Sequence, residues 1–199
     1  MTDLAAQKRP LALAITLVAG GVIGFIAAFA LTLDKFQALE HPSQALSCDF
    51  SFIVQCGKNL SSAQGSAFGF PNPVIGLAGF FAVIVVGMAL FAGARFDRWF
   101  WIVFNLGLTF AIGFVIWLIS QSIFVLGTLC PWCMVVWVVT IPLFLSVTLR
   151  NLSTGVLPSS ERARRFFTAA QSWVPLASLI CYLIVALIAQ VHLNFLAIL

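Results

Sequence analysis

Two cysteines, Cys130 and Cys133, enclose a proline and a tryptophan within a long run that carries no charged residue, 99–149. Such a CxxC pair can close into a disulfide and open again, so it can accept and release two electrons. Pro131 suits the first position of a helix, where its missing N–H is not needed, which makes Cys130 the predicted cap residue. The partial positive charge at a helix N-terminus favours thiolate, the reactive form of cysteine. We therefore predict a redox-active pair.

The alternative is that these two cysteines are inert small hydrophobic residues, but Pro131 and a second cysteine pair argue against it. Cys48 and Cys56 form that second pair, eight positions apart in a loop that a turn can close. A thiolate of one pair can attack the disulfide of the other, which makes an electron relay. A zinc site built from all four thiolates is the less favoured rival, because zinc sites usually combine two closely spaced pairs. The remaining Cys181 is expected to be a packed thiol.

The composition places these cysteines in a membrane protein. Of 199 residues, 62% are hydrophobic and 8% are charged, whereas a soluble domain has about 25% charged residues. The runs without charged residues are 10–33, 59–94, 99–149 and 166–199. Each exceeds the roughly 20 residues that a helix needs to cross a bilayer, and the run 99–149 can hold two crossings. We predict an all-α polytopic membrane protein with five helices, at about 10–33, 74–93, 99–119, 131–149 and 173–198.

The basic residues predict how the chain is oriented. The net charge is +4, but Lys and Arg lie beside hydrophobic runs and form no continuous stripe, so nucleic acid is not an expected partner. Eight of the ten lie in 1–9, 95–98 and 150–165, all on one side of the membrane. The positive-inside rule assigns this side to the cytoplasm. The N-terminus is then inside, and the four candidate cysteines lie at the outer face of the cytoplasmic membrane, in an oxidising compartment.

The segment 34–73 is predicted to be an external lid over the helix bundle. A loop of this length in a compact bundle is usually functional, and Phe50, Phe52, Phe68 and Phe70 give it apolar surface to lie on the outer mouth. We expect one or two short helical pieces in it. Asp34, just outside the first helix, is expected to be a solvated charge.

The order of these motifs resembles that of the vitamin K epoxide reductase family, in particular its bacterial members that oxidise partner proteins and reduce quinone. The motifs are Cys48, Cys56-Gly-Lys-Asn-Leu-Ser61-Ser62, Phe68-Gly-Phe-Pro-Asn72-Pro-Val-Ile-Gly76 and the CPWC that opens the fourth helix. The resemblance covers about 10–150 and implies a four-helix catalytic domain over 1–150. Residues 151–199 would add a cytoplasmic loop and a peripheral fifth helix. Some bacterial relatives carry a fused thioredoxin domain; since this sequence ends at Leu199, we expect a separate partner.

The resemblance also implies a role for each cysteine. Cys133 would lie nearest the quinone, menaquinone or ubiquinone, and pass electrons to it. Cys130 would exchange with Cys56 of the lid. Cys48 would meet the thiol of a soluble thioredoxin-fold protein outside the cytoplasm.

Four further residues are implied in ligand binding or lid order. Ser62 would order the lid, with Ser61 as a stand-in, and helix capping is the alternative for either. Asn72 would donate a hydrogen bond to a quinone carbonyl, and a turn residue between two prolines is its alternative. Trp137 stands where the vertebrate enzymes have a ligand-contacting tyrosine. An indole N–H can donate but cannot accept a hydrogen bond, which argues against epoxide reduction and leaves quinone reduction intact.

These inferences predict an oxidoreductase that moves electrons from a protein dithiol to quinone and supports disulfide-bond formation. The alternative is a non-catalytic membrane protein, a transporter or assembly subunit, whose disulfides only brace its loops. A third possibility is the same relay run in reverse, as a reductant of disulfides outside the cell, because thiol–disulfide exchange is reversible.

Overall fold

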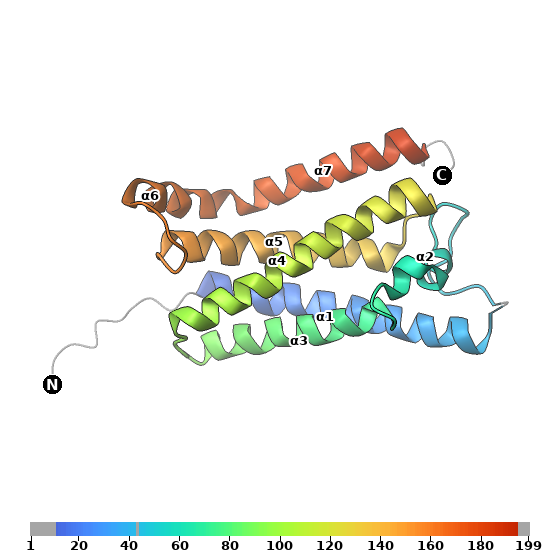
Figure 1. The fold of residues 1–199 in the computed structure, drawn as a ribbon, viewed down its shortest axis with the longest axis horizontal. Coiled ribbons are helices and arrows are strands. Elements are labelled where there is room, and N and C mark those ends of the chain that lie inside the picture. The colour runs from blue at the N-terminus through green and yellow to red at the C-terminus, as the bar shows by residue number, and fades with distance from the viewer. Residues whose placement is uncertain (1–10, 43, 195–199) are drawn as a thin grey trace.

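The computed structural model describes residues 11–42 and 44–194 of the chain. Long helices run along the main axis of the molecule, and α4 crosses the others at a slant (Figure 1). The five long helices are α1 (Leu11–Glu40), α3 (Asn72–Phe91), α4 (Arg98–Ser120), α5 (Pro131–Ser153) and α7 (Val174–Leu193). Each belongs to a stretch long and apolar enough to span a membrane. This confirms the predicted all-α polytopic fold.

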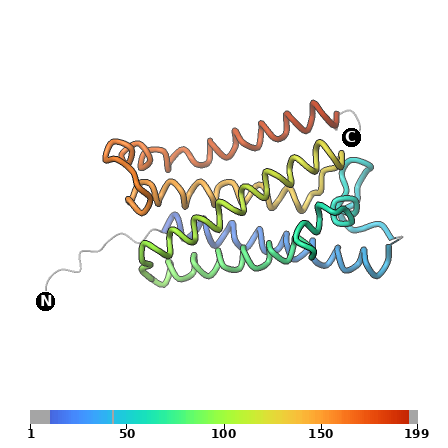
Figure 2. Tube along the Cα trace, viewed as in Figure 1, coloured from blue at the N-terminus to red at the C-terminus, as the bar shows by residue number. Residues whose placement is uncertain are grey.

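Shorter elements lie at the two ends of the bundle. The lid contains α2 (Gly57–Ser61) and the 3-10 turn η1 (Ala63–Ser66), as expected for a lid with short helical pieces. A π-helical turn, η2 (Gln121–Leu126), continues α4 toward the CxxC motif. At the opposite end, α6 (Glu161–Ala170) and η3 (Gln171–Trp173) lead into α7. In the Cα trace, the lid lies at one end of the bundle and α6 lies at the other (Figure 2).

Several helix ends differ from the predicted boundaries. The first helix ends at Glu40 rather than Leu33, because charged residues do not break a helix and the first proline in this region is Pro42. Asp34 is consequently part of α1 and not of a solvated loop. The segment 151–172, predicted as a loop, contains α6, whose N-cap Ser160 accepts a hydrogen bond from the backbone N–H of Ala163 at 3.3 Å. The last residues of the predicted fifth helix, 195–198, lie outside the described residues.

Glycines let α1 and α3 pack closely. A Cβ added at Gly21 would lie 2.8 Å from the side chain of Ile84, and one added at Gly87 would lie 2.7 Å from Val18. No side chain fits at these two positions without displacing its neighbour. Small residues at such contacts bring helix backbones together, which is how helices gain van der Waals contact in lipid.

Polar contacts fix α4 and α5 at the end remote from the lid. The amide of Asn151, which is fully buried, donates to the carbonyl of Trp101 at 3.2 Å and to Oδ1 of Asn105 at 3.0 Å. The guanidinium of Arg150 lies 3.9 Å from the centre of the Trp101 ring, a favourable cation–π distance. On the other side of α5, the hydroxyl of Tyr182 in α7 donates to the carbonyl of Val138 at 2.6 Å. These contacts hold α5 between α4 and α7.

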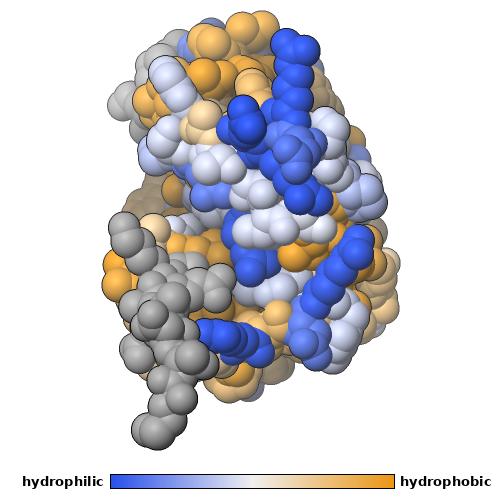
Figure 3. All heavy atoms as spheres, turned by 90° about the vertical axis from the view of Figure 1, so that its left-hand side faces the viewer, coloured by the Kyte–Doolittle hydropathy of each residue, from blue (hydrophilic) through white to orange (hydrophobic). Residues whose placement is uncertain are grey.

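Basic side chains gather at the end of the bundle that carries α6 and the α3–α4 turn. In the view onto this end, hydrophilic side chains cover much of the surface, while hydrophobic ones lie at the sides (Figure 3). The exposed arginines of the α3–α4 turn and α6 are Arg95, Arg98, Arg162, Arg164 and Arg165. The lid and the CxxC motif lie at the opposite end (Figure 1), so charge and cysteines are separated along the bundle axis.

We expect Gly21→Val to lower the free energy of unfolding by about 1–3 kcal/mol, since overpacking a tight contact forces the helices apart. Thermal unfolding of the detergent-purified protein measures this. Gly113→Val in α4 is the matched control, because a Cβ there meets nothing within 4 Å. Equal losses in the two variants would contradict a close α1–α3 contact.

Candidate redox centre

The lid is folded around a disulfide between Cys48 and Cys56. The carboxylate of Asp49, between them, accepts hydrogen bonds from three backbone N–H groups: Leu46 at 3.1 Å, Cys56 at 2.7 Å and Gly57 at 3.0 Å. It thereby occupies the N-terminus of α2, where a negative charge is favourable. Asp49 holds the loop in the closed turn that brings the two cysteines together.

A two-stranded bridge of backbone hydrogen bonds sets the lid against the start of α5. The N–H of Leu129 donates to the carbonyl of Ile53 at 2.7 Å, and the N–H of Gln55 donates to the carbonyl of Leu129 at 3.1 Å. Gln55 directly precedes Cys56, and Leu129 directly precedes Cys130. The register of this bridge therefore places one cysteine of each pair side by side.

The sulfur atoms of Cys130 and Cys56 lie 3.2 Å apart. Neither residue is exposed to solvent, and Leu31, Leu46, Leu60 and Trp132 pack around them. Cys130 is the N-cap of α5, as predicted, and its sulfur accepts a hydrogen bond from the N–H of Cys133 at 3.4 Å. A free thiol beside a disulfide in this arrangement has the geometry of thiol–disulfide exchange.

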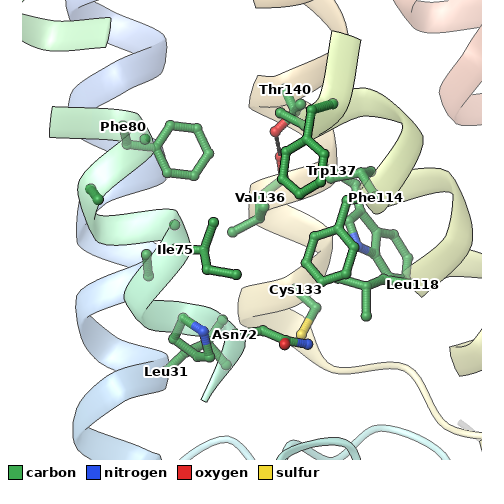
Figure 4. Close-up of a pocket in the computed structure, with 18 of the residues that line it drawn as sticks. Leu31, Asn72, Ile75, Phe80, Phe114, Leu118, Cys133, Val136, Trp137 and Thr140 are labelled. Atoms are coloured by element: carbon green, nitrogen blue, oxygen red, sulfur yellow. Dashed lines mark hydrogen bonds between the residues drawn. The ribbon is translucent and has the colours of Figure 1, made fainter. Parts of the chain in front are cut away.

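Cys133 is a free cysteine one helical turn into α5, and it lines a cavity of about 600 Å³. The cavity lies between α1, α3, α4 and α5 under the lid, and its lining is almost entirely apolar. Figure 4 shows the sulfur of Cys133 and the amide of Asn72 at one end of the cavity, with Phe80 and Thr140 toward the other. A chamber of this size and character suits a small aromatic or quinonoid ring.

The structure brings three of the four predicted ligand and lid residues to this cavity. Asn72, Trp137 and Ser62 line it, and Ser61 does not. Asn72 also braces the lid: its Nδ2 donates to the carbonyl of Gln64 at 2.6 Å, and its Oδ1 accepts from the N–H of Ala67 at 3.0 Å. The indole N–H of Trp137 has no hydrogen-bond partner among the described residues, which leaves it available to a ligand.

The two serines differ in what they hold. Ser62 caps η1: its hydroxyl accepts from the N–H of Gly65 at 3.1 Å and donates to the carbonyl of Asn59 at 2.7 Å. The exposed Ser61 donates to Gly57 within its own helical turn at 2.7 Å. The helix-capping interpretation therefore describes Ser62, and its two hydrogen bonds join α2 to η1 above the cavity.

Sequence reasoning missed a polar contact that docks the lid on the loop before α5. The amide of Asn59 donates to the hydroxyl of Thr128 at 2.9 Å, and Ser122 donates to the carbonyl of Thr128. Thr128 is fully buried. The one signal in the sequence was a threonine placed two residues before Cys130 in an apolar run, which gives no hint of its partner 69 positions earlier.

Asp34 was also misjudged. It is 6% exposed, and its Oδ2 lies 3.2 Å from the sulfur of Cys48. Asp34, Cys48 and Cys56 offer three potential metal ligands within 4.8 Å of one another. Zinc binds thiolates, however, and in this state the two sulfurs are joined in a disulfide.

Cys181, in α7, is a free cysteine away from the other four.

The fold and the site together define a multi-pass membrane oxidoreductase of the thiol–disulfide class. The family model described as the Vitamin K epoxide reductase family matches residues 15–148, and the chain belongs to this family. Its members carry out thiol and quinone redox chemistry within membranes. No curated protein matches the chain.

Replacing Ser62 by Ala should loosen the lid by about 0.5–2 kcal/mol, the usual cost of losing a helix cap. Hydrogen exchange of the backbone amides in 54–66, measured on the full-length protein in nanodiscs, should accelerate accordingly. Ser61→Ala is the control, since this hydroxyl is exposed and bonds only to its own turn. If the two variants exchange at the same rate, Ser62 does not order the lid.

Proposed function

We propose that the chain is a membrane quinone reductase that oxidises an extracytoplasmic thioredoxin-fold protein and so supports disulfide-bond formation. The observation that carries the proposal is the 3.2 Å contact between the Cys130 thiol and the Cys56 sulfur, with Cys133 on the adjoining apolar cavity. Together, the disulfide, the thiol pair and the chamber form a continuous path for two electrons.

The relay proceeds by exchange of disulfides. The dithiol of the partner reduces Cys48–Cys56 through a mixed disulfide at Cys48, and the partner leaves oxidised. The thiolate of Cys56 then attacks Cys130 in a Cys130–Cys133 disulfide, and Cys133 leaves as a thiolate. Cys48 finally attacks Cys56, which re-forms the lid disulfide and releases Cys130. The closed lid with free Cys130 and Cys133 corresponds to the state at the end of this sequence.

The electron acceptor binds in the cavity. Cys130 and Cys133 give two electrons to a quinone in the chamber, two protons from the aqueous phase complete the quinol, and the disulfide between the two cysteines re-forms as the quinol leaves. The indole N–H of Trp137 and the second amide hydrogen of Asn72 are donors for the quinone carbonyls. Menaquinone and ubiquinone share the carbonyl pair that these donors would bind. No step requires the epoxide chemistry from which the family takes its name.

The charge distribution supports an orientation for this chemistry. The basic end with α6 faces the cytoplasm under the positive-inside rule, so the lid and its disulfide face the outer compartment of the cytoplasmic membrane. That compartment favours disulfides. A strongly oxidising thiol partner with a potential of about −120 mV needs an acceptor of higher potential, and a membrane quinone kept oxidised by respiration meets this need. The forward direction is therefore favoured over a reductase.

The lid must open for the partner to react. Cys48 is 3% exposed, so no protein thiol reaches it in this state. Two lysines hold the lid down: the ammonium of Lys58 donates to the carbonyl of Leu126 at 2.6 Å, and that of Lys35 donates to Leu60 at 2.6 Å. Both contacts end on single carbonyl groups and can exchange with water. Opening must also break the backbone bridge at Leu129 and the contact between Asn59 and Thr128.

A purely structural role for the disulfides is less consistent with this arrangement. A disulfide that only braces a loop is best kept away from free thiols, because a neighbouring thiolate opens it. Here a free thiol is held in contact with the lid disulfide by a dedicated backbone bridge.

Cys133→Ser should abolish quinone reduction, because Cys130 alone cannot form the disulfide that passes electrons on. The full-length protein in nanodiscs, with dithiothreitol as donor and a soluble quinone as acceptor, would show turnover reduced to background. With no oxidant left for the lid, Cys48 and Cys56 should stay reduced under dithiothreitol, which peptide mapping after alkylation would show. Cys181→Ser is the control and keeps wild-type turnover. Full activity of Cys133→Ser would refute the relay.

Trp137→Phe should raise the KM for quinone about fivefold, since it keeps the ring and removes one hydrogen-bond donor worth about 1 kcal/mol. The exchange between the two cysteine pairs should continue at its normal rate. Trp117→Phe, in α4 and outside the cavity lining, serves as the matched variant. A KM that does not change in Trp137→Phe argues against contact between this indole and the quinone.

A further inference from the structure

Asp34 has contacts that a structural role does not explain. It is buried near the lid end of α1, and apart from its contact with Cys48 its side chain has one hydrogen bond among the described residues, a long one of 3.4 Å donated by the hydroxyl of Ser47. Among the described residues it forms no ion pair, and the ammonium of the adjacent Lys35 is occupied by the carbonyl of Leu60. Asp49, which is half-buried, is the contrast, because its carboxylate accepts hydrogen bonds from three backbone N–H groups.

Instead, Oδ2 of Asp34 faces the sulfur of Cys48 at 3.2 Å. A disulfide sulfur carries no proton, so two acceptors would meet at this distance unless the carboxyl group supplies the proton between them. In the reduced lid the roles of donor and acceptor reverse, because Cys48 then carries a thiol proton that the carboxylate can accept. One atom pair is thus placed to pass a proton back and forth as the lid changes redox state.

We propose that Asp34 is a catalytic residue that takes the proton of Cys48 when the lid is oxidised and returns it when the lid is reduced. The inference rests on the proposed relay and deepens it. In the oxidising direction the carboxylate removes the thiol proton of Cys48. The resulting thiolate attacks Cys56, the Cys48–Cys56 bond forms and the Cys56–Cys130 bond breaks. The electron pair leaves with Cys130 as a thiolate, and the proton stays on Asp34.

Cys48 needs such a base more than Cys130 does. The sulfur of Cys130 sits at the N-terminus of α5 and accepts a hydrogen bond from the N–H of Cys133, so it faces the positive end of a helix. Cys48 lies in a loop and is 3% exposed, and among the described residues no helix begins at it and no cation donates a hydrogen bond to its sulfur. Burial without such a partner disfavours the thiolate. The carboxylate of Asp34 compensates by taking the proton as the sulfur attacks.

The same carboxyl acts in the opposite sense when the partner protein reduces the lid. The partner first forms a mixed disulfide at Cys48, and its second thiol then resolves that bond and expels Cys48, which is a poor leaving group as a buried thiolate. Transfer of the proton from Asp34 to Cys48 as the bond breaks removes that charge. The other titratable cysteines of this cluster are Cys56, Cys130 and Cys133 as thiols. The charged groups beside it are Lys35, whose ammonium donates to the carbonyl of Leu60, and Asp49, whose carboxylate accepts from backbone N–H groups.

The test measures the resolution of the mixed disulfide in the full-length protein in nanodiscs. The fully reduced protein is mixed anaerobically with a soluble quinone, quenched with N-ethylmaleimide at successive times and mapped by mass spectrometry. In Asp34→Asn, the first oxidation of Cys130 and Cys133 should proceed at the wild-type rate. The Cys56–Cys130 species should then accumulate, and its conversion to Cys48–Cys56 should slow about a hundredfold at neutral pH, the lower end of what general acid–base catalysis contributes.

The pH profile separates a proton-transfer role from a structural one. Without the carboxylate, hydroxide must deprotonate Cys48. The rate of the slowed step should therefore rise about tenfold for each unit of pH, while the rate in the wild type should rise less. Asp34→Glu should recover part of the rate. Glu40→Gln, at the exposed end of the same helix, is the control and should match the wild type. A wild-type resolution rate in Asp34→Asn, or a loss of rate that does not respond to pH, would overturn the inference.

A second measurement does not depend on any variant folding. Infrared difference spectra of the wild-type protein between its reduced and oxidised states should show the C=O stretching band of a carboxylic acid appearing as the lid disulfide forms. Absence of this band would overturn the proposal. If the wild type forms no Cys56–Cys130 species at all, the relay itself fails. If it forms and resolves that species and Asp34→Asn does the same, only the role of Asp34 fails.

Discussion

The contact between the sulfur atoms of Cys130 and Cys56 is the constraint around which the rest of the chain is arranged. Thiol–disulfide exchange needs the attacking sulfur close to its target, so two segments separated by 74 positions must meet reproducibly. The backbone bridge through Ile53, Gln55 and Leu129 sets this register. The helices contribute rigidity: close α1–α3 packing and the Asn151 contacts hold α5, and hence the CxxC motif, in one place.

The two cysteine pairs occupy different kinds of structure, and their chemistry follows from this. Cys130 and Cys133 are fixed on the first turn of α5, where one sulfur reaches the lid and the other reaches the apolar cavity. Cys48 and Cys56 belong to a lid docked by a few polar contacts, such as that between Asn59 and Thr128. A rigid cysteine pair suits electron transfer to a quinone at a defined depth in the membrane. A movable cysteine pair suits thiol–disulfide exchange with a protein outside the membrane.

Local sequence signals predicted the spans and the CxxC motif well. Hydropathy identifies helices that cross a membrane because every residue of a span contributes, and proline after Cys130 predicts a helix start because its missing N–H is tolerated only there. The end of α1 and the docking of Asn59 on Thr128 were not predictable in this way. Both depend on how distant segments fold together, and a charged pair such as Asp34-Lys35 looks like a helix end until the lid covers it.

The two acids of the redox centre show why burial must be interpreted through its partners. Asp34 and Asp49 both lie within contact distance of the lid disulfide or its backbone, and the sequence offers no distinction between them. Asp49 accepts hydrogen bonds from three backbone N–H groups of the lid. Asp34 faces a sulfur that has a proton in one redox state and none in the other. A buried carboxyl group with one weak hydrogen bond is costly to keep for stability alone. Its position is understandable if the sulfur beside it must change charge in a space that water does not reach.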